Sequence, residues 1–493
     1  MRRLTAGLLV LTLTLFAVAC SFRPAEPAGA SDTKPQATDA KTDAGAETGA
    51  SATAAPTEAT TKKPDTPEKP ERPEKPERPE KPEVPSYSGG TLKGEYQLEN
   101  GNEMKRYEKV AENGFADYRK QLTDAGYTLY DSHEIGANRY ATLTKSDSAV
   151  SLCYIAADNS LTVTVDLLER TALYPREDYD GSTKVTDTTL GIISLNYAMQ
   201  GGKKDPETGE NLDGNGMSFV ITLEDGRYIV IDGGYDSDVS RLRSYLRDNN
   251  KRTDGIKIAA WIMTHSHPDH YGCLDAFYFN CASWGIEVEY VIANPVPESR
   301  QNPNFAYEAW MRDKLPKIVE RLGAKYVMPH AGQVLHFCNA ELEILYTHEN
   351  MVPELIWNPN EASTVFRLKA DGKSVLFLGD VEFSTPVLTK MYGAELKSDI
   401  VQINHHGYAG GSQTETAEEL RLIDPSIAIW TTSRATFDLR RSASDTEPRR
   451  QPFRDLIDKI GLENCLIADG PCKLLPMKYT SLADMTTYEF PTT

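Results

Sequence analysis

Histidine and aspartate side chains are crowded into one short segment of this chain. His265, His267, Asp269 and His270 fall within six residues, inside the segment Thr264–His270. Imidazole and carboxylate groups together suit Zn²⁺, and Mn²⁺ or Fe are alternatives. In a loop, His265 and His267 can turn to one ion while Asp269 and His270 turn to a second, about 3.5–4 Å away. The spacing predicts a centre for two metal ions rather than a solvated run of surface residues.

Two further motifs follow apolar strands later in the chain. The run Val375–Leu378 leads to Asp380, and the run Asp399–Ile403 leads to His405 and His406. Asp380 is the predicted bridging ligand, and His406 is the predicted ligand of the histidine pair. We expect His405 to act behind it as an orienting group or a proton donor, and the reverse assignment of the two histidines is the alternative.

The elements that must position these residues alternate between strands and helices. Ile258–Met263 is a continuous apolar run, which is typical of a strand buried on both faces. Phe219–Leu223 and Tyr228–Asp232 predict a hairpin, and Asp238–Arg247 predicts a helix. The first histidine cluster follows the C-terminal end of a strand, where α/β sheets usually bind their ligands. An α/β fold is therefore expected.

Together, these motifs resemble the metallo-β-lactamase superfamily over residues 189–480. The resemblance implies an αβ/βα sandwich with two divalent metal ions at its edge, most often Zn. Asn360-x-x-Ser363, added to the other motifs, resembles the hydrolase domain of bacterial DNA-uptake channel proteins. It is also similar to the cell-wall phosphorylcholine esterases of the same superfamily.

One departure from the family pattern narrows the expected chemistry. Members that hydrolyse β-lactams or thioesters usually carry another metal histidine before the bridging aspartate. The histidines in that interval are His330, His336 and His348, and none lies in a matching motif. For His330, which precedes Ala-Gly in a turn, we expect a hydrogen-bonded structural role. The missing ligand disfavours β-lactamase or glyoxalase-type activity and favours the phosphoesterase-like branch.

The expected reaction is the hydrolysis of a phosphodiester-type substrate by a metal-activated hydroxide. Two cations sharing Asp380 lower the pKa of a bridging water from 15.7 toward about 7, so no serine or cysteine nucleophile is required. Asp269 and His405 are the expected catalytic residues. The alternatives are a metal-dependent nuclease related to the DNA-uptake proteins and a non-catalytic binding lipoprotein with a degenerate metal site.

A run of arginines after the histidine pair indicates a site for an anionic substrate. The stretch has few apolar residues before Pro452, which predicts a loop. Guanidinium groups bind phosphates with two parallel hydrogen bonds. The alternative is a solvated surface that pairs with local acids, such as Asp438, Asp445 and Glu447. The arginines are Arg434, Arg440, Arg441, Arg449, Arg450 and Arg454.

The first residues of the chain predict a location outside the cytoplasm. Two arginines precede the apolar run Leu4–Ala19, which is shorter than the roughly 20 residues of a spanning helix. Residues 1–20 resemble a bacterial lipoprotein signal peptide that ends at Cys20. The resemblance implies cleavage before Cys20, palmitate on its thiol and anchoring to the cell membrane. A plain secreted protein with a chance cysteine is the alternative.

A stalk and a small module are predicted between this signal and the catalytic part. Residues 21–88 have almost no apolar periodicity, and proline recurs at every third position from Pro64 to Pro85, which matches an extended polyproline II spacer. Residues 89–171 predict a small α+β module. It contains one amphipathic helix, near 115–126, and alternating strands at 140–143, 150–154 and 161–166.

Charge and cysteine content limit the partners. The formal net charge is -19, and an acidic chain is poorly suited to long nucleic acid, which is bound mainly through Lys and Arg. A small molecule or an envelope polymer, anionic in the phosphodiester case, is the expected partner; nucleic acid is the less favoured one. Of seven cysteines, Cys465 and Cys472 flank a turn and are candidates for a disulfide in an oxidising compartment. Buried free thiols are the expectation for most of them.

Overall fold

The computed structural model describes residues 83–204, 209, 212–302, 307–382, 385–408, 412–442 and 444–491. The predicted signal peptide 1–20, with its lipidated Cys20, lies outside the described residues. So does the predicted stalk 21–88, up to residue 82. In the described ranges, no helix combines the length and the apolar character that a membrane crossing requires.

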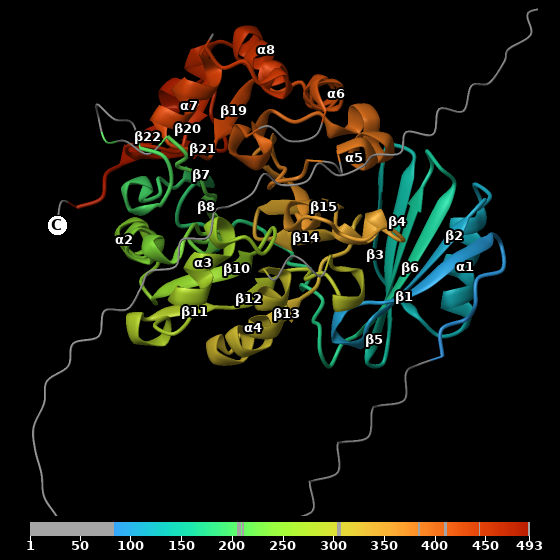
Figure 1. The fold of residues 1–493 in the computed structure, drawn as a ribbon. Helices are drawn as coiled ribbons and strands as arrows, with labels where there is room; N and C mark the ends of the chain where they lie inside the picture. Colours follow the sequence, from blue (N-terminus) through green and yellow to red (C-terminus); the bar gives the residue numbers. More distant parts are fainter. Residues whose placement is uncertain are drawn as a thin grey trace, which may run out of the picture. The chain divides into compact units, whose positions relative to one another are not determined.

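Strands of the described residues form three sheets, of six, nine and seven strands (Figure 1). The first sheet holds β1 (Thr91–Gln97), β2 (Glu103–Glu108), β3 (Thr128–Ile135), β4 (Asn138–Lys145), β5 (Ser148–Ile155) and β6 (Ser160–Leu167). Its order is β1-β2-β6-β5-β4-β3, and all its neighbours are antiparallel. Helix α1 (Gly114–Asp124) packs on one face of this sheet and shares a core with it.

The second and third sheets form a sandwich. The second holds β7 (Thr189–Ile192), β8 (Ser218–Thr222), β9 (Tyr228–Asp232), β10 (Ile256–Ile262), β11 (Ile286–Val288), β12 (Tyr290–Ile292), β13 (Lys325–Val327), β21 (Cys472–Pro476) and β22 (Thr486–Tyr488). The third holds β14 (Val334–Phe337), β15 (Ala340–Tyr346), β16 (Val365–Ala370), β17 (Lys373–Phe377), β18 (Ile400–Gln402), β19 (Ile427–Trp430) and β20 (Cys465–Ile467). Phe219 and Phe377 pack edge to face between the two sheets, with ring centroids 5.0 Å apart.

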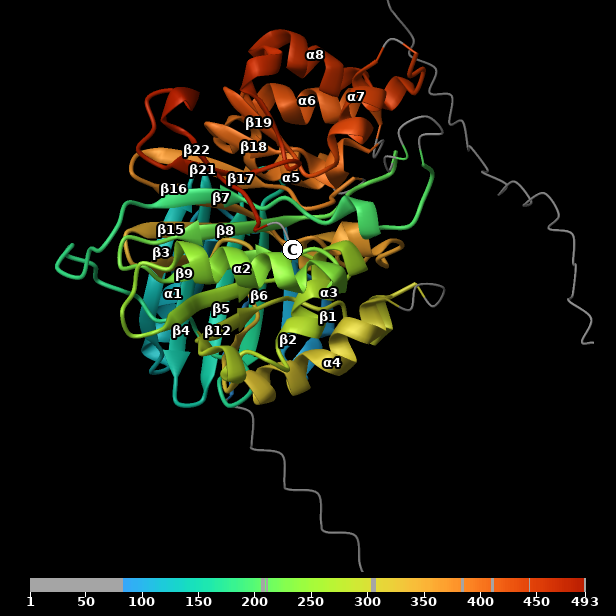
Figure 2. The same ribbon diagram turned by 90° about the vertical axis from the view of Figure 1, so that its left-hand side faces the viewer.

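Helices cover both outer faces of the sandwich. Those on the second sheet, in front in Figure 2, are α2 (Val239–Asn249), α3 (Pro268–Phe277) and α4 (Tyr307–Leu322). Those on the third are α5 (Thr385–Tyr392), α6 (Gln413–Ile423), α7 (Arg434–Arg441) and α8 (Gln451–Ile460). On β9, Ile229 and Ile231 face the core between the sheets, whereas Tyr228 and Val230 face the helices. Two buried faces explain why such strands are continuously apolar, and the predicted αβ/βα sandwich with an α+β module is confirmed.

Three expectations from the sequence need correction. The sandwich does not end at residue 480, because β22 pairs with β21 beyond it. The arginine-rich stretch is mostly not a loop: its arginines lie on α7, on the 3-10 helix η10 (Pro448–Arg450) and on α8, because Phe437 and Phe453 are buried beneath α7 and α8. Cys465 and Cys472 do not pair, since they lie on different sheets, and the described cysteines are all buried free thiols.

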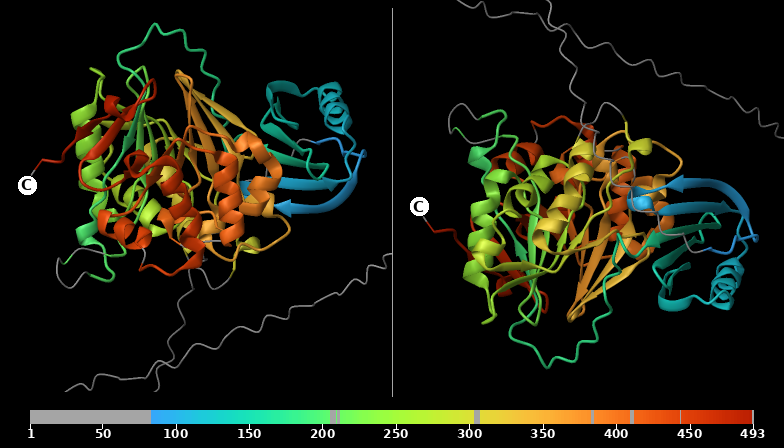
Figure 3. Two further views of the ribbon diagram at one scale, coloured as in Figure 1. Left: turned by 90° about the horizontal axis from the view of Figure 1, so that it is seen from above. Right: turned by 90° about the horizontal axis from the view of Figure 1, so that it is seen from below.

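The first sheet packs its other face against the sandwich, on the side away from α1 (Figure 3). Ile135 and Tyr140 from this sheet share an apolar cluster with residues of the third sheet and α5. The Tyr140 hydroxyl lies 3.1 Å from the Tyr392 hydroxyl. At Gly332, which has a φ of +91°, any Cβ would overlap the Tyr140 ring. The contact between the first sheet and the sandwich, called the seam from here on, therefore requires glycine at that turn.

A buried ion cluster crosses the same seam. His330 Nε2 lies 2.9 Å from an Asp166 carboxylate oxygen on β6, and His330 Nδ1 lies 2.9 Å from Glu349. Burial alone would lower the pKa of His330, but the two carboxylates outweigh it and hold that pKa well above its usual value. The expected structural role of His330 is confirmed, and its partners show that it fastens the module to the sandwich.

We expect His330→Ala to lower the free energy of unfolding by about 3–5 kcal/mol near neutral pH, because two buried carboxylates lose their shared partner. The wild-type contribution is complete below the unfolded imidazole pKa of about 6.5, and it is lost as pH rises through the raised folded pKa. Urea unfolding of both proteins across this range measures the difference, which should shrink at alkaline pH. A difference that does not change with pH would contradict the assignment. His336→Ala, which removes only a loose contact to Glu341 at 3.7 Å, should cost less than about 1 kcal/mol.

Candidate metal centre

Strand ends from both sheets of the sandwich meet at one edge and bring the six predicted metal ligands together. The segment after β10 supplies the first cluster, Asp380 follows β17 and His406 follows β18. Potential ligand atoms of Asp269, His270, Asp380 and His406 lie within 4.8 Å of one another. A second group, formed by His265, His267 and the same Asp380, meets the same limit. The structure thus divides the ligands as the spacing predicted, with Asp380 in both groups.

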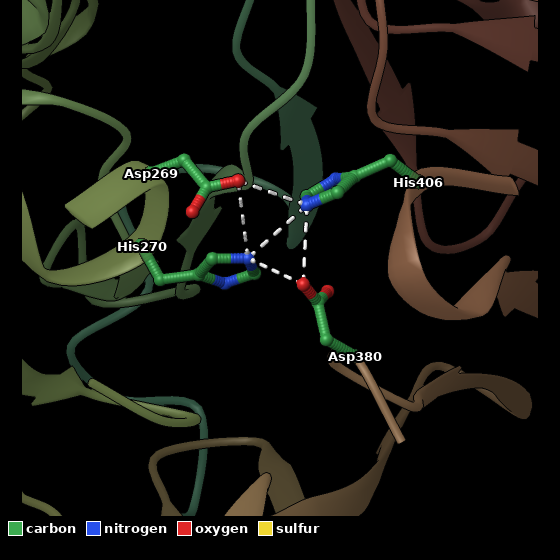
Figure 4. Close-up of side chains that lie close together, drawn as sticks. All are labelled: Asp269, His270, Asp380 and His406. Atoms are coloured by element: carbon green, nitrogen blue, oxygen red, sulfur yellow. Dashed lines mark hydrogen bonds and ion pairs between the residues drawn. The ribbon is translucent and has the colours of Figure 1, made fainter. Parts of the chain in front are cut away.

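The four-residue group is tightly converged (Figure 4). His406 Nε2 lies 3.1 Å from Asp269 Oδ2 and 3.2 Å from Asp380 Oδ2. His270 Nε2 lies 3.2 Å from Asp380 Oδ2 and 3.3 Å from His406 Nε2. Two imidazoles and two carboxylates aimed at one point are a suitable donor set for Zn²⁺, Mn²⁺ or Fe.

The three-residue group shares Asp380 Oδ2 with the four-residue group. His265 Nε2 lies 3.0 Å from His267 Nδ1 and 3.7 Å from Asp380 Oδ2. Asp380 is 1% exposed, and its Oδ1 has no hydrogen-bond partner. An unpaired carboxylate oxygen in a buried site is costly. A carboxylate that bridges two cations would resolve this, so the residues fit the two ions that the motifs predicted.

In three of these histidines the other ring nitrogen, Nδ1, contacts a polar group outside the two ligand groups. His270 Nδ1 lies 2.7 Å from Asp232 Oδ2, and His406 Nδ1 lies 2.8 Å from the Thr431 hydroxyl. His265 Nδ1 lies 3.2 Å from the Ser363 hydroxyl. Such contacts fix both the orientation and the tautomer of an imidazole ligand. All three rings therefore present Nε2 to the site.

Asp232 positions the site but was predicted from the sequence only as the last residue of a hairpin strand. It is fully buried at the end of β9 and has a φ of +56°. Its carboxylate accepts hydrogen bonds from the Thr264 backbone N–H at 2.8 Å and from the Thr264 hydroxyl at 2.7 Å. It therefore holds the start of the histidine segment as well as His270. An aspartate directly after an apolar strand was the available signal.

The histidine pair sits on an unusual turn. His405 and His406 both have left-handed backbones, with φ of +44° and +55°. Non-glycine residues rarely adopt this conformation, and it persists where the surroundings enforce it. Here the His405 N–H donates to the Gly379 carbonyl at 3.1 Å, and Arg440 Nη1 donates to the His406 carbonyl at 2.8 Å. The turn places His406 in the four-residue ligand group and leaves His405 outside both ligand groups.

His405 is placed beside the metal groups rather than in them. Its Nδ1 contacts the Glu382 carboxylate, and its Nε2 lies 3.4 Å from Asn360 Nδ2. The ring of Tyr408, a residue 44% exposed, lies 5.2 Å from the His405 ring. This position agrees with the expected orienting or proton-donating role, which stays a prediction. Glu382 was not singled out from the sequence, because only the tertiary fold brings it to His405.

The neighbouring imidazoles keep the carboxylates of the site ionised. Burial would raise the pKa of Asp269 and Asp380, but the imidazoles of His270 and His406 hold both carboxyl pKa values below their usual range. Burial would lower the pKa of His406, but Asp380 and Asp269 raise it to about 9. Burial is the main reason that the pKa of His265 falls well below its usual value. Two buried, ionised carboxylates therefore favour the binding of cations at this site.

The arginines after the histidine pair mostly serve the fold. Arg441 pairs with Asp438 at 2.8 Å, and Arg450 pairs with Asp445 at 2.8 Å. Arg440 is buried, its pKa is lowered to about 10 by that burial, and it holds the His406 carbonyl. The local pairing that was the alternative to phosphate binding is therefore the arrangement observed for these arginines.

Comparison with known proteins supports the same assignment. Residues 212–431 match the family model described as the metallo-beta-lactamase superfamily. This match confirms the resemblance that the sequence motifs indicated. No curated protein sequence matches the chain.

Several solved structures resemble the chain at low sequence identity. The metallo-beta-lactamase fold protein YhfI from Bacillus subtilis is 10% identical, with 58% of this chain and 98% of that chain covered at a TM-score of 0.33. Zn²⁺-bound PqqB from Methylobacterium extorquens is 10% identical, with 58% and 99% covered at a TM-score of 0.37. CmlA from Streptomyces venezuelae, a diiron beta-hydroxylase, is 13% identical, with 57% and 52% covered at a TM-score of 0.32.

We expect His265→Ala to reduce the bound metal from about two ions per chain to about one, because it removes a ligand of the smaller group. Asp380→Ala should release both ions, because its carboxylate belongs to both groups. Elemental analysis of the purified proteins measures this content. His336→Ala, a histidine outside both groups, is the matched control and should keep about two ions. Full metal content in the His265→Ala protein would contradict the assignment.

Proposed function

Because residues 212–431 form a metallo-β-lactamase superfamily domain, we propose that this chain is an extracytoplasmic metal-dependent hydrolase acting on a phosphodiester-type substrate. The observation that carries the proposal is the joining of two ligand groups through Asp380. Two divalent cations, Zn²⁺ first among them, supply Lewis acidity and an activated water when bound there. Mn²⁺ and Fe are the alternatives for the same donor set.

Each ligand group has a separate task in this scheme. His265 and His267 would hold the first cation, and His270 and His406 would hold the second together with Asp269. Asp380 belongs to both groups. Because the site is buried and its rings are anchored from behind, these side chains need little rearrangement to accept cations.

A thiol nucleophile does not fit this site. Cys273, on α3 one turn after His270, is fully buried, and burial raises its pKa well above the usual value. Burial also raises the pKa of Cys153 and Cys465 to about 12. Such thiols stay protonated at neutral pH and are poor nucleophiles. This supports hydrolysis by water rather than through a covalent cysteine intermediate.

His405 is the residue we assign to the leaving group. Its contact with Glu382 fixes the ring, and the side chain is 21% exposed, so the imidazole reaches solvent while its neighbour His406 does not. A histidine held by a carboxylate on one nitrogen can deliver a proton from the other. His405 therefore orients the substrate, or protonates the oxygen that leaves once the substrate replaces the long 3.4 Å contact between His405 Nε2 and the Asn360 amide.

The substrate class and the location rest on the sequence. The predicted lipid-bearing Cys20 and the stalk favour an envelope polymer or an extracellular nucleotide as substrate. A nuclease is less favoured, because the chain is acidic and the arginines Arg441 and Arg450 are already paired. A non-catalytic binding lipoprotein is the remaining alternative, and an assay of hydrolytic activity distinguishes it from the hydrolase.

We expect the purified protein to cleave bis-p-nitrophenyl phosphate, to lose this activity on chelation and to regain it with Zn²⁺ or Mn²⁺. Asp380→Asn should reduce the rate by at least about 100-fold, because the shared ligand is weakened at both cations. Nitrocefin and single-stranded DNA, tested in parallel, should not be cleaved. Cleavage of the DNA would favour the nuclease. No cleavage of any substrate by protein shown to carry both ions would overturn the proposal in favour of a binding lipoprotein.

A further inference from the structure

The two ligand groups are unequal. Among the described residues, one group contains four potential ligands and the other only three, namely His265, His267 and Asp380. Zn²⁺ in proteins is usually four-coordinate, and other divalent ions take more ligands. A side chain with a free oxygen beside His265 and His267 would therefore change both the affinity and the openness of the first site.

Asn360 has such an oxygen. The residue is 2% exposed, and its Oδ1 is buried without a hydrogen-bond partner. Its Nδ2 is the end that faces Glu382 Oε1, at 3.4 Å, and His405 Nε2, also at 3.4 Å. Since a carboxylate accepts only from the amide nitrogen, these neighbours fix the orientation of the amide. The unpaired atom is therefore the carbonyl oxygen, which is the metal-binding end of an amide.

The backbone turns Asn360 toward the first site. Asn360 lies on the 3-10 helix η7 (Pro359–Ala362), and its backbone carbonyl accepts a hydrogen bond from the Ser363 N–H at 3.0 Å. The Ser363 hydroxyl in turn contacts His265 Nδ1. The amide nitrogen of Asn360 faces His405, the residue before the ligand His406. Asn360 therefore lies between Ser363, which contacts the three-residue group, and His405.

We propose that the Asn360 amide oxygen is an additional protein ligand of the first metal ion. The inference rests on the metal centre of the proposed function and does not depend on its substrate. A neutral oxygen ligand adds no charge to a pocket that already holds two carboxylates. It also binds more weakly than imidazole, so a substrate oxygen can displace it. The first ion would then be held in the resting protein and opened on substrate binding.

The test is the zinc affinity of the holoprotein, measured by competition with a chromophoric chelator. Asn360→Ala should weaken one of the two sites by about 10–100-fold and leave the other unchanged. Asn360→Asp, which keeps the oxygen and adds a charge, should restore or tighten that site. The Co²⁺-loaded proteins give a second readout, because losing a ligand changes the visible absorption of one of the two ions.

A matched control comes from the neighbouring 3-10 helix η6 (His348–Met351). Asn350 on that helix caps the Thr347 N–H at 3.0 Å, away from the ligand groups, so Asn350→Ala should keep both affinities. Two wild-type affinities in Asn360→Ala would overturn the proposal and leave a substrate-binding role. Equal weakening of both sites would also overturn it, because it indicates a general structural role. If wild-type protein binds two ions but cleaves nothing, the proposed function fails while this inference stands.

Discussion

Two carboxylates and four imidazoles are crowded into one largely buried site, and the fold around it is arranged so that this concentration of charge is tolerated. Asp380 is central, because both ligand groups depend on it. The imidazoles of His265, His270 and His406 are held through Nδ1, as His270 is by Asp232, and present Nε2 to the site. Such ties come from strand ends, so β9, β10, β17, β18 and β19 must all end at one edge of the sandwich. The two-sheet architecture is what brings those ends together.

The site also depends on backbone conformations that are unfavourable by themselves. Asp232, His405 and His406 all have positive φ values, and each such residue costs on the order of 1–3 kcal/mol. The buried strands on either side, with Phe219 and Phe377 packed between the sheets, supply the stability that offsets this cost. The free energy gained by burying the apolar core thus offsets the unfavourable backbone conformations at the edge that holds the ligands.

Much of this centre follows from the sequence, because its ligands are neighbours along the chain or follow apolar strands directly. The division of the first cluster between two groups of potential ligands, and the place of Asp380 in both groups, were predicted in this way. The residues that fix the ligands were less accessible: Glu382 meets His405 only through the tertiary fold, and nothing in its local sequence marks it. The arginine-rich stretch was wrongly predicted as a loop, because a few buried residues such as Phe437 suffice to hold a short helix against a sheet. The composition of a short stretch does not predict a helix that is stabilised by packing against residues distant in the sequence.

The seam between the module and the sandwich has a consequence for how this protein can diverge. Tyr140 fills the space that any side chain at position 332 would need. A lineage can accommodate a larger residue 332 only if residue 140 becomes smaller, and the φ of +91° at position 332 restricts that replacement further. The same holds for charge, because Asp166 and Glu349 are balanced by one histidine from a third segment. Module and sandwich are therefore expected to co-vary at these positions, and to be inherited as a pair rather than exchanged between proteins.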